Sequence, residues 1–320
     1  MTDDERWIGA ALALAARGVG QTAPNPSVGC VIVKDGRVVG RGWTQPGGRP
    51  HAEAMALADA GAAARGAVAY VTLEPCAHES VRGPACADLL AAAGVARVVA
   101  ALRDPDPRTD GVGLTRLTAA GIDTRCGLRE GEARASMAGF LTRRAQGRPH
   151  VTLKLALSLD GGVAMGDGRS QWITGPEARA HAHLERARHD LILVGAGTLA
   201  ADAPRLDVRL SGLEDRAPRR VLLSRSAVAP DGWLAIREPA AIAGLPGDLL
   251  LVEGGAATAA AFLAADLVDR LLLYRAPILI GAARTLADIG LRDLGQAHGR
   301  WLLTDRRTLG VDTLEVYGRA

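Results

Sequence analysis

Four residues in the first half of the chain have the types and spacing of a catalytic metal centre. His51, Cys76 and Cys86 offer an imidazole and two thiolates, which Zn²⁺ prefers, and Glu53 lies two residues after His51. Three protein ligands leave a fourth position for water, and zinc lowers the pKa of that water to about 7. Glu53 can reach the water without binding the metal and can carry its proton to a leaving amine. The pattern predicts hydrolytic deamination of an amino-heterocycle.

The local sequence predicts how these residues are positioned. One helix is expected to begin at His51 and another at Cys86. Pro75 follows a strand and suits the opening of a helical turn, whose N-terminus would favour the thiolate of Cys76. A structural zinc site and a set of unligated cysteines are the alternatives for this group of residues.

Two glycine-rich turns in the second half follow predicted strands and precede predicted helices. They are Gly195-Ala-Gly-Thr198 and Gly254-Gly-Ala256. Without side chains, such turns let backbone amides approach a pyrophosphate at a helix N-terminus. The strand over 220–224 ends beside Arg225, and an arginine there suits a 2′-phosphate, so the pattern favours NADP over NAD.

Strands and helices alternate in both halves, which indicates two α/β domains in a chain of 320 residues. We place the join in the polar stretch 143–150, with domains over 1–146 and 147–320. In the first half we expect strands at 28–33, 37–43, 67–73 and 95–102 and helices at 4–18, 51–60 and 86–93. In the second half we expect strands at 151–157, 190–195, 220–224, 248–252 and 270–275 and helices at 176–188 and 256–265.

Composition excludes several classes of protein. The net charge is +3, the basic residues are scattered and aromatic residues make up 3%, so we expect no nucleic-acid partner. No apolar run is long enough for a membrane span, and the acidic start is unlike a signal peptide, so we expect a cytoplasmic protein without a membrane partner. Cys30 and Cys126 are attributed to packing.

The motifs of the first half resemble a known zinc family. His51-Ala-Glu53 with Pro75-Cys76 is similar to the motif of the cytidine-deaminase-like α/β/α fold. Pro24-Asn-Pro-Ser-Val-Gly29 and Cys76-Ala-His78 resemble one branch of it, the bifunctional deaminase–reductases of riboflavin biosynthesis. Nine residues separate Cys76 from Cys86, and the loop 78–86 is one residue longer than is usual in that branch.

The second half is similar to the reductase domain of the same family, which has a dihydrofolate-reductase-like α/β fold. The motifs that carry this likeness are Lys154-Leu-Ala-Leu-Ser-Leu-Asp160-Gly, Ser170-Gln-Trp172-Ile-Thr174-Gly, Gly195-Ala-Gly-Thr198-Leu-Ala-Ala-Asp202-Ala-Pro204 and Glu253-Gly-Gly. The resemblance therefore covers nearly the whole chain. The sequence departs from the family at Gly162, where a basic residue is more frequent, and at Ala203, where a second acid is common.

The resemblance implies a two-step enzyme. The first domain would hold one Zn²⁺ and deaminate 2,5-diamino-6-(5-phosphoribosylamino)pyrimidin-4-one. The second would use NADPH to reduce the ribosyl side chain to ribityl, which gives 5-amino-6-(5-phosphoribitylamino)uracil. The protein supplies binding and orientation, while the cofactor supplies the reducing chemistry.

The resemblance also implies roles for particular residues. Glu53 would be the proton carrier, and Asn25 and His78 would hold the pyrimidine. The residues that would contact NADPH are Ala156, Trp172, Thr198, Asp202, Gly255, Ala256, Ala257 and Thr258. Those that would face the reductase substrate are Ser170, Arg186, Leu206, Arg209 and Glu253. Cationic side chains suit a ribose phosphate, and assistance to hydride transfer by Glu253 or Asp202 is a hypothesis.

Three other interpretations stay open at this point. The chain could be a nucleoside or tRNA deaminase fused to an unrelated domain, although its charge argues against RNA. It could be a protein in which only one domain is active, or a zinc-stabilised binding module that chelation would unfold. We also expect a small-molecule substrate and a homo-oligomer.

Overall fold

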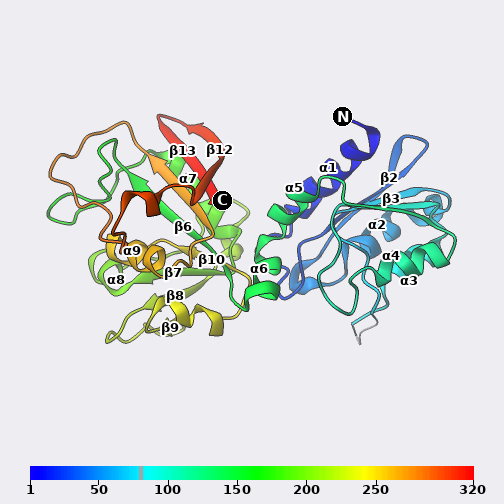
Figure 1. The fold of residues 1–320 in the computed structure, drawn as a ribbon, viewed down its shortest axis with the longest axis horizontal. Coiled ribbons are helices and arrows are strands. Elements are labelled where there is room, and N and C mark those ends of the chain that lie inside the picture. The colour runs from blue at the N-terminus through cyan, green and yellow to red at the C-terminus, as the bar shows by residue number, and fades with distance from the viewer. Residues whose placement is uncertain (79–81) are drawn as a thin grey trace. The chain divides into compact units, whose positions relative to one another are not determined.

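The computed structural model describes residues 1–78 and 82–320, and they form two compact units, Met1–Gly147 and Arg148–Ala320 (Figure 1). Each unit has one sheet with helices packed on it, as the alternating pattern predicts. The division between the units falls inside the polar stretch 143–150. No helix within these described residues has the length and apolar character to cross a membrane.

The first unit is built on a five-stranded sheet with the order β2-β1-β3-β4-β5. β1 is antiparallel to both of its neighbours, whereas β3, β4 and β5 run parallel. The strands are β1 (Gly29–Lys34), β2 (Arg37–Trp43), β3 (Val68–Val71), β4 (Arg97–Ala100) and β5 (Asp123–Cys126). The helices are α1 (Asp3–Ala15), α2 (Ala52–Ala60), α3 (Cys86–Ala93), α4 (Val112–Ala119), α5 (Glu130–Ser136) and α6 (Ala138–Gln146).

Glycines on β1 and β2 let two helices lie directly on the sheet. A methyl group on Gly29 would lie 1.9 Å from the carbonyl oxygen of Ala11 in α1. On the opposite face, a methyl group on Gly42 would lie 2.1 Å from the carbonyl oxygen of Ala52, the first residue of α2. Because any side chain would collide with helix backbone, these positions fix where α2 begins and therefore where His51 lies.

The second unit has an eight-stranded sheet with the order β12-β13-β11-β6-β10-β7-β8-β9. The strands from β11 to β9 are parallel, and the hairpin β12–β13 is antiparallel. The parallel strands are β6 (His150–Leu157), β7 (Leu191–Gly195), β8 (Arg219–Leu223), β9 (Leu234–Ile236), β10 (Leu249–Val252) and β11 (Arg270–Arg275). The hairpin is β12 (Trp301–Leu309) and β13 (Asp312–Arg319), and the helices are α7 (Pro176–Ala187), α8 (Ala196–Asp202) and α9 (Ala256–Ala264).

The parallel strands place their carboxyl ends at one edge of this sheet, where ligands bind in open α/β sheets. Buried residues of α7 pack with Leu272 and Tyr274 of β11, whereas Phe262 of α9 packs with Leu153 and Leu193 on the other face. The hairpin β12–β13 and the short β9 were not predicted. β12 is exposed along most of its length, so its sequence lacks the alternation that marks a half-buried strand.

The start of β6 makes the stability of the second unit depend on pH. Burial lowers the pKa of His150 from 6.5 to about 4, and its Nδ1 has no partner within the described residues. Between these two pKa values the unfolded chain binds a proton that the folded chain excludes. We predict that the free energy of unfolding falls by roughly 1 kcal/mol for each pH unit as the pH is lowered through this range.

Urea unfolding of the 320-residue chain between pH 7 and pH 4 measures this dependence. The variant His150→Gln should show a smaller loss, and His298→Gln, at an exposed position, should follow the wild type. Equal pH dependence in all three proteins would contradict the assignment to His150.

Candidate active sites

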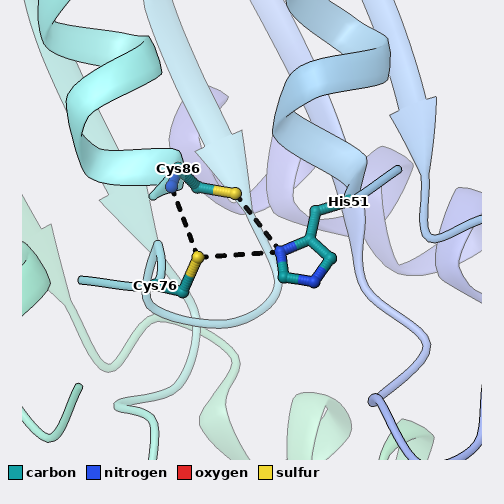
Figure 2. Close-up of side chains that lie close together, drawn as sticks. All are labelled: His51, Cys76 and Cys86. Atoms are coloured by element: carbon teal, nitrogen blue, oxygen red, sulfur yellow. Dashed lines mark hydrogen bonds between the residues drawn. The ribbon is translucent and has the colours of Figure 1, made fainter. Parts of the chain in front are cut away.

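The three predicted metal ligands of the first unit meet in the structure (Figure 2). His51 Nδ1 lies 3.4 Å from Cys86 Sγ and 3.7 Å from Cys76 Sγ, and all three ligand atoms lie within 4.8 Å of one another. A tetrahedral zinc site with bonds of 2.0 to 2.3 Å has ligand–ligand distances of about 3.6 Å. The residues therefore fit zinc in their donor types and in their spacing.

The N-terminus of α3 stabilises the sulfur of Cys76. The backbone N–H of Cys86 donates to Cys76 Sγ at 3.3 Å, and hydrogen bonding to the Cys86 side chain lowers the pKa of Cys76. The expectation that Pro75 and Cys76 open a helical turn of their own is wrong, since no helix is assigned there. The helix end that favours the thiolate belongs instead to α3, across the centre.

Glu53 lies in the first turn of α2 with 3% of its surface exposed. Burial raises its pKa to about 7, although the neighbouring His51 opposes this rise. A carboxyl with this pKa is suited to accept and return a proton near neutral pH. The structure thus places a carboxyl suited to proton transfer beside the centre, lining the same pocket as His51 and Cys76.

A pocket of about 210 Å³ opens beside the metal centre and contains both residues expected to hold the pyrimidine. The side-chain amide of Asn25 donates to the carbonyl of Gly48 at 2.8 Å and lies 2.9 Å from His51 Nε2. Nδ1 of His78 lies 3.4 Å from Thr109 Oγ1. Of the longer loop 78–86, residues 79–81 lie outside the described part of the chain.

Several pocket residues were missed by the sequence analysis. They are Arg49, Glu74, Arg82, Asp104, Asp106, Arg108 and Arg144. Glu74 is buried and accepts backbone hydrogen bonds from Asp104, Gly111 and Leu114, so it joins the segment before Cys76 to the start of α4. An acidic residue directly before Pro75-Cys76 was the available signal, but its partners are distant in sequence.

The cysteines outside the centre differ from each other. Cys30 is fully buried in β1, as its packing role requires. Cys126 is exposed at the end of β5, so its attribution to packing is wrong. β5 is an edge strand, and three of its four residues are exposed.

The second unit contains a larger cavity, of about 1110 Å³, at the carboxyl edge of the parallel strands. It brings together nearly all of the predicted reductase residues. Those that line it are Ala156, Ser170, Trp172, Arg186, Thr198, Asp202, Leu206, Arg209, Glu253, Gly255, Ala256, Ala257 and Thr258. Arg225 does not line the cavity and is exposed beyond the end of β8, so the structure does not bring it to the site.

The two glycine turns meet at Thr258. A methyl group on Gly195 would lie 2.2 Å from Thr258 Oγ1, and one on Gly254 would lie 2.4 Å from Thr258 Cβ. The backbone N–H of Gly255 donates to Thr198 Oγ1 at 3.1 Å, which joins the N-termini of α8 and α9. The turns therefore form one continuous backbone surface that suits a pyrophosphate.

Glu253 is the centre of a buried charge cluster. Arg186 donates to both of its carboxylate oxygens, at 2.8 and 2.9 Å, and Lys154 Nζ lies 3.8 Å away. Burial alone would raise the pKa of Glu253, but Lys154 and Arg186 hold it at about 2. Arg186 also donates to the carbonyl of Asp207, so its donors are largely used inside the protein. Sequence analysis did not select Lys154 as a site residue.

Trp172 is 63% exposed, which argues against a role in the core. The guanidinium of Arg179 lies 5.0 Å from the centre of its ring. Asp202 lies at the end of α8, 3.4 Å from the side-chain amide of Gln171. Ala203, one of the two departures from the family pattern, has a positive φ of 38° and ends α8.

Comparisons with known proteins identify both units. The zinc-binding region of cytidine and deoxycytidylate deaminases matches residues 1–102, and the RibD C-terminal domain matches residues 149–242 and 239–313. The riboflavin biosynthesis protein RibD of Escherichia coli K12 is 44% identical over 344 residues, which cover 92% of this chain and 94% of that protein. The chain belongs to the RibD family. RibD of Mycobacterium tuberculosis H37Rv is 40% identical, covering 92% of this chain and 91% of that one.

Solved RibD structures have the same fold over the whole chain. Acinetobacter baumannii RibD superimposes with a TM-score of 0.89 at 36% identity, covering 99% of each chain. A Thermotoga maritima protein described as a diaminohydroxyphosphoribosylaminopyrimidine deaminase/5-amino-6-(5-phosphoribosylamino)uracil reductase gives 0.90 at 31% identity, also covering 99% of each. As a RibD protein, the chain joins a zinc-dependent deaminase to an NADPH-dependent reductase of riboflavin biosynthesis, as the sequence predicts.

The contact between α4 and the segment before Cys76 offers a test of the metal centre. A methyl group on Gly113 would lie 2.0 Å from the carbonyl oxygen of Pro75. We predict that Gly113→Ala displaces Pro75 and Cys76 and weakens zinc binding by about tenfold or more, as loss of ligand support commonly does. Competition with a chromophoric chelator measures the affinity.

Gly131→Ala is the matched control, because Gly131 is also helical and has no atom close to where a methyl group would stand. Its zinc affinity should equal that of the wild type. Unchanged affinity in Gly113→Ala would show that the packing of α4 does not support the centre.

Proposed function

We propose that the first unit deaminates 2,5-diamino-6-(5-phosphoribosylamino)pyrimidin-4-one and that the second reduces the ribosyl chain of the product with NADPH. The final product would be 5-amino-6-(5-phosphoribitylamino)uracil. The observation that carries the proposal is the convergence of His51, Cys76 and Cys86 beside buried Glu53, in a chain that also holds a cavity lined by nearly all of the predicted reductase residues. The name of the Thermotoga maritima relative supports the choice of substrate.

In the deaminase unit, His51, Cys76 and Cys86 would hold zinc, which when bound supplies an activated water at neutral pH. Glu53 accepts a proton and returns it to the departing amine, a task that matches its pKa of about 7. Asn25 and His78 orient the heterocycle in the pocket. The four arginines of the lining suit the substrate's phosphate; they are Arg49, Arg82, Arg108 and Arg144.

In the reductase unit, NADPH supplies the hydride and the joined glycine turns would receive its pyrophosphate. Glu253 stays ionised near neutral pH because its pKa is about 2, which removes it as the acid of this step. Its carboxylate instead holds Lys154 in the cavity, and we assign the role of proton donor to the Lys154 ammonium. Arg209, about half exposed, has donors left for the substrate's phosphate.

Coupled turnover tests both steps in one chain. With the diaminopyrimidine substrate, the wild type should oxidise NADPH, and Glu53→Gln should reduce that rate by about 10³-fold because the proton carrier is lost. Given the deaminated intermediate directly, Glu53→Gln should oxidise NADPH at the wild-type rate.

The two substrates also separate the remaining interpretations. The reductase assignment would be contradicted if the wild type failed to oxidise NADPH when given either of the two substrates. A protein that consumes only the deaminated intermediate would be a reductase with an inactive deaminase unit. Zinc content of Glu53→Gln, measured by atomic absorption, should equal that of the wild type, since Glu53 is not assigned as a ligand.

We also propose that the chain forms a homo-oligomer and acts in the cytoplasm. β12 is an edge strand of nine residues, and its Leu302 and Leu303 are 58% and 53% exposed. A long, exposed edge strand that carries adjacent apolar side chains can be covered by the same strand of a second copy through an isologous contact. The four free cysteines are compatible with a reducing compartment.

We predict that Leu303→Arg separates the oligomer, because a charge would then have to be buried in the contact. Light scattering coupled to size exclusion should give a multiple of the 33.2 kDa chain mass for the wild type and the single-chain mass for the variant. Val228→Arg, at another exposed apolar position, should keep the wild-type mass. A monomeric wild type would refute the proposal.

A further inference from the structure

Two segments that follow β6 and β11 form one wall of the reductase cavity. They span 158–168 and 276–287, and we call them the cavity wall. The residues of the wall that line the cavity are Val163, Ala164, Gly168, Arg284, Thr285 and Ala287. The segments pair through backbone hydrogen bonds, from Val163 N to the carbonyl of Arg284 at 2.8 Å and from Arg284 N to the carbonyl of Ala164 at 2.9 Å. Neither segment is helical, so its position depends on such cross-links.

Asp160 joins the two segments. Its carboxylate accepts hydrogen bonds from the N–H groups of Gly281 at 2.8 Å and Ile280 at 3.2 Å, and from Ser158 Oγ at 2.5 Å. The hydroxyl of Ser158 is buried and in turn accepts from the N–H of Gly162 at 2.8 Å. These bonds, led by the one from Ser158, lower the pKa of Asp160 to about 2, so the carboxylate is ionised throughout the neutral range.

Gly162 allows the segments to approach each other closely. A methyl group there would lie 2.4 Å from Ala283 Cβ and 2.9 Å from Ser158 Oγ. Backbone of the first segment therefore packs directly on the second. This contact accounts for glycine at a position where the sequence departs from the family pattern.

The wall also brings one cationic side chain, that of Arg284, to the lining of the cavity. Arg186 and Lys154 share Glu253, and Arg209 pairs with Asp207. In the described part of the chain, Arg284 has no ion pair, and its Nε donates only to the carbonyl of Gly166 at 3.2 Å. Asp167 of the same wall interacts with this guanidinium electrostatically. Its remaining N–H donors suit a ligand with several negative charges, such as NADPH.

We propose that Asp160 is a positioning residue of the reductase: by holding the two segments of the cavity wall together, it sets the affinity for NADPH. It touches no reacting atom and acts through the wall, chiefly through the placement of Arg284. The inference rests on the proposed function, because it requires that the cavity receives NADPH.

Quenching of tryptophan fluorescence by NADPH, without substrate, tests the proposal. Asp160→Ala should raise the dissociation constant about tenfold, equivalent to ~1.4 kcal/mol. Asp293→Ala is the matched control, because Asp293 is also an aspartate that accepts a backbone N–H, but only within its own turn. The rate of deamination, measured by ammonia release, should be the same in all variants, which shows that the first unit is folded. A thermal unfolding transition of the second unit close to that of the wild type shows that the reductase unit is folded as well.

A second pair of variants tests the wall contact independently. Gly162→Ala should weaken NADPH binding, because the new methyl group forces the segments apart. The double variant Gly162→Ala/Ala283→Gly removes the opposing methyl group and should restore affinity to within about twofold of the wild type.

The outcomes separate this inference from the proposed function. If the wild type binds no NADPH, the proposed reductase function fails. If the wild type binds NADPH and Asp160→Ala binds it equally well, only the positioning role is overturned. Failure of Ala283→Gly to rescue Gly162→Ala would likewise overturn the role of the wall contact.

Discussion

The deaminase unit depends on two helices that begin at candidate metal ligands on the same face of its sheet. His51 precedes α2 and Cys86 opens α3, so both N-termini converge on one point. The glycines of β2 let α2 lie against the strand, and the backbone N–H of Cys86 stabilises the sulfur of Cys76. A site with two thiolates needs such support, because their charges repel each other until a cation or hydrogen-bond donors compensate them.

In the reductase unit the charges that must be compensated are positive, because several cationic side chains line its cavity. Glu253 neutralises part of that charge by binding Arg186 and Lys154. The same carboxylate orients the lysine toward the cavity. Glu253 therefore both compensates the positive charges of the cluster and positions one of its cationic side chains. Glu253 lies directly before the glycine turn, so the end of β10 places the carboxylate next to the backbone surface that suits a pyrophosphate.

Much of this architecture could be predicted from local pattern. The buried strands of both sheets have dense apolar runs, and the candidate zinc ligands were recognisable because such a combination of residue types is rare and their order is distinctive. Partners that depend on distant segments could not be predicted. The hydrogen bonds of Glu74 to the start of α4 become apparent only in the folded structure. Arg225 follows a correctly predicted strand but does not line the cavity.

The errors have the same origin. A proline before Cys76 suggested a local helix end, yet the stabilising helix end came from α3, ten residues further along the chain. The exposed edge strands could not be predicted for another reason. β12 and Cys126 face solvent, so burial imposes no apolar pattern on their sequence. Residue types reveal which chemistry is present, while packing decides which of several similar residues performs it.

The position of Thr258 limits which substitutions the two glycine turns can accept. It fills the space above Gly195 and Gly254 at once, so three positions from two separate turns share a single volume. A side chain at either glycine would need a smaller residue at 258, and the loss of Thr258 would leave both turns without lateral support. We therefore expect Gly195, Gly254 and Thr258 to change only together during evolution. Substitutions meant to alter the dinucleotide preference of this enzyme should be better tolerated elsewhere along the cavity.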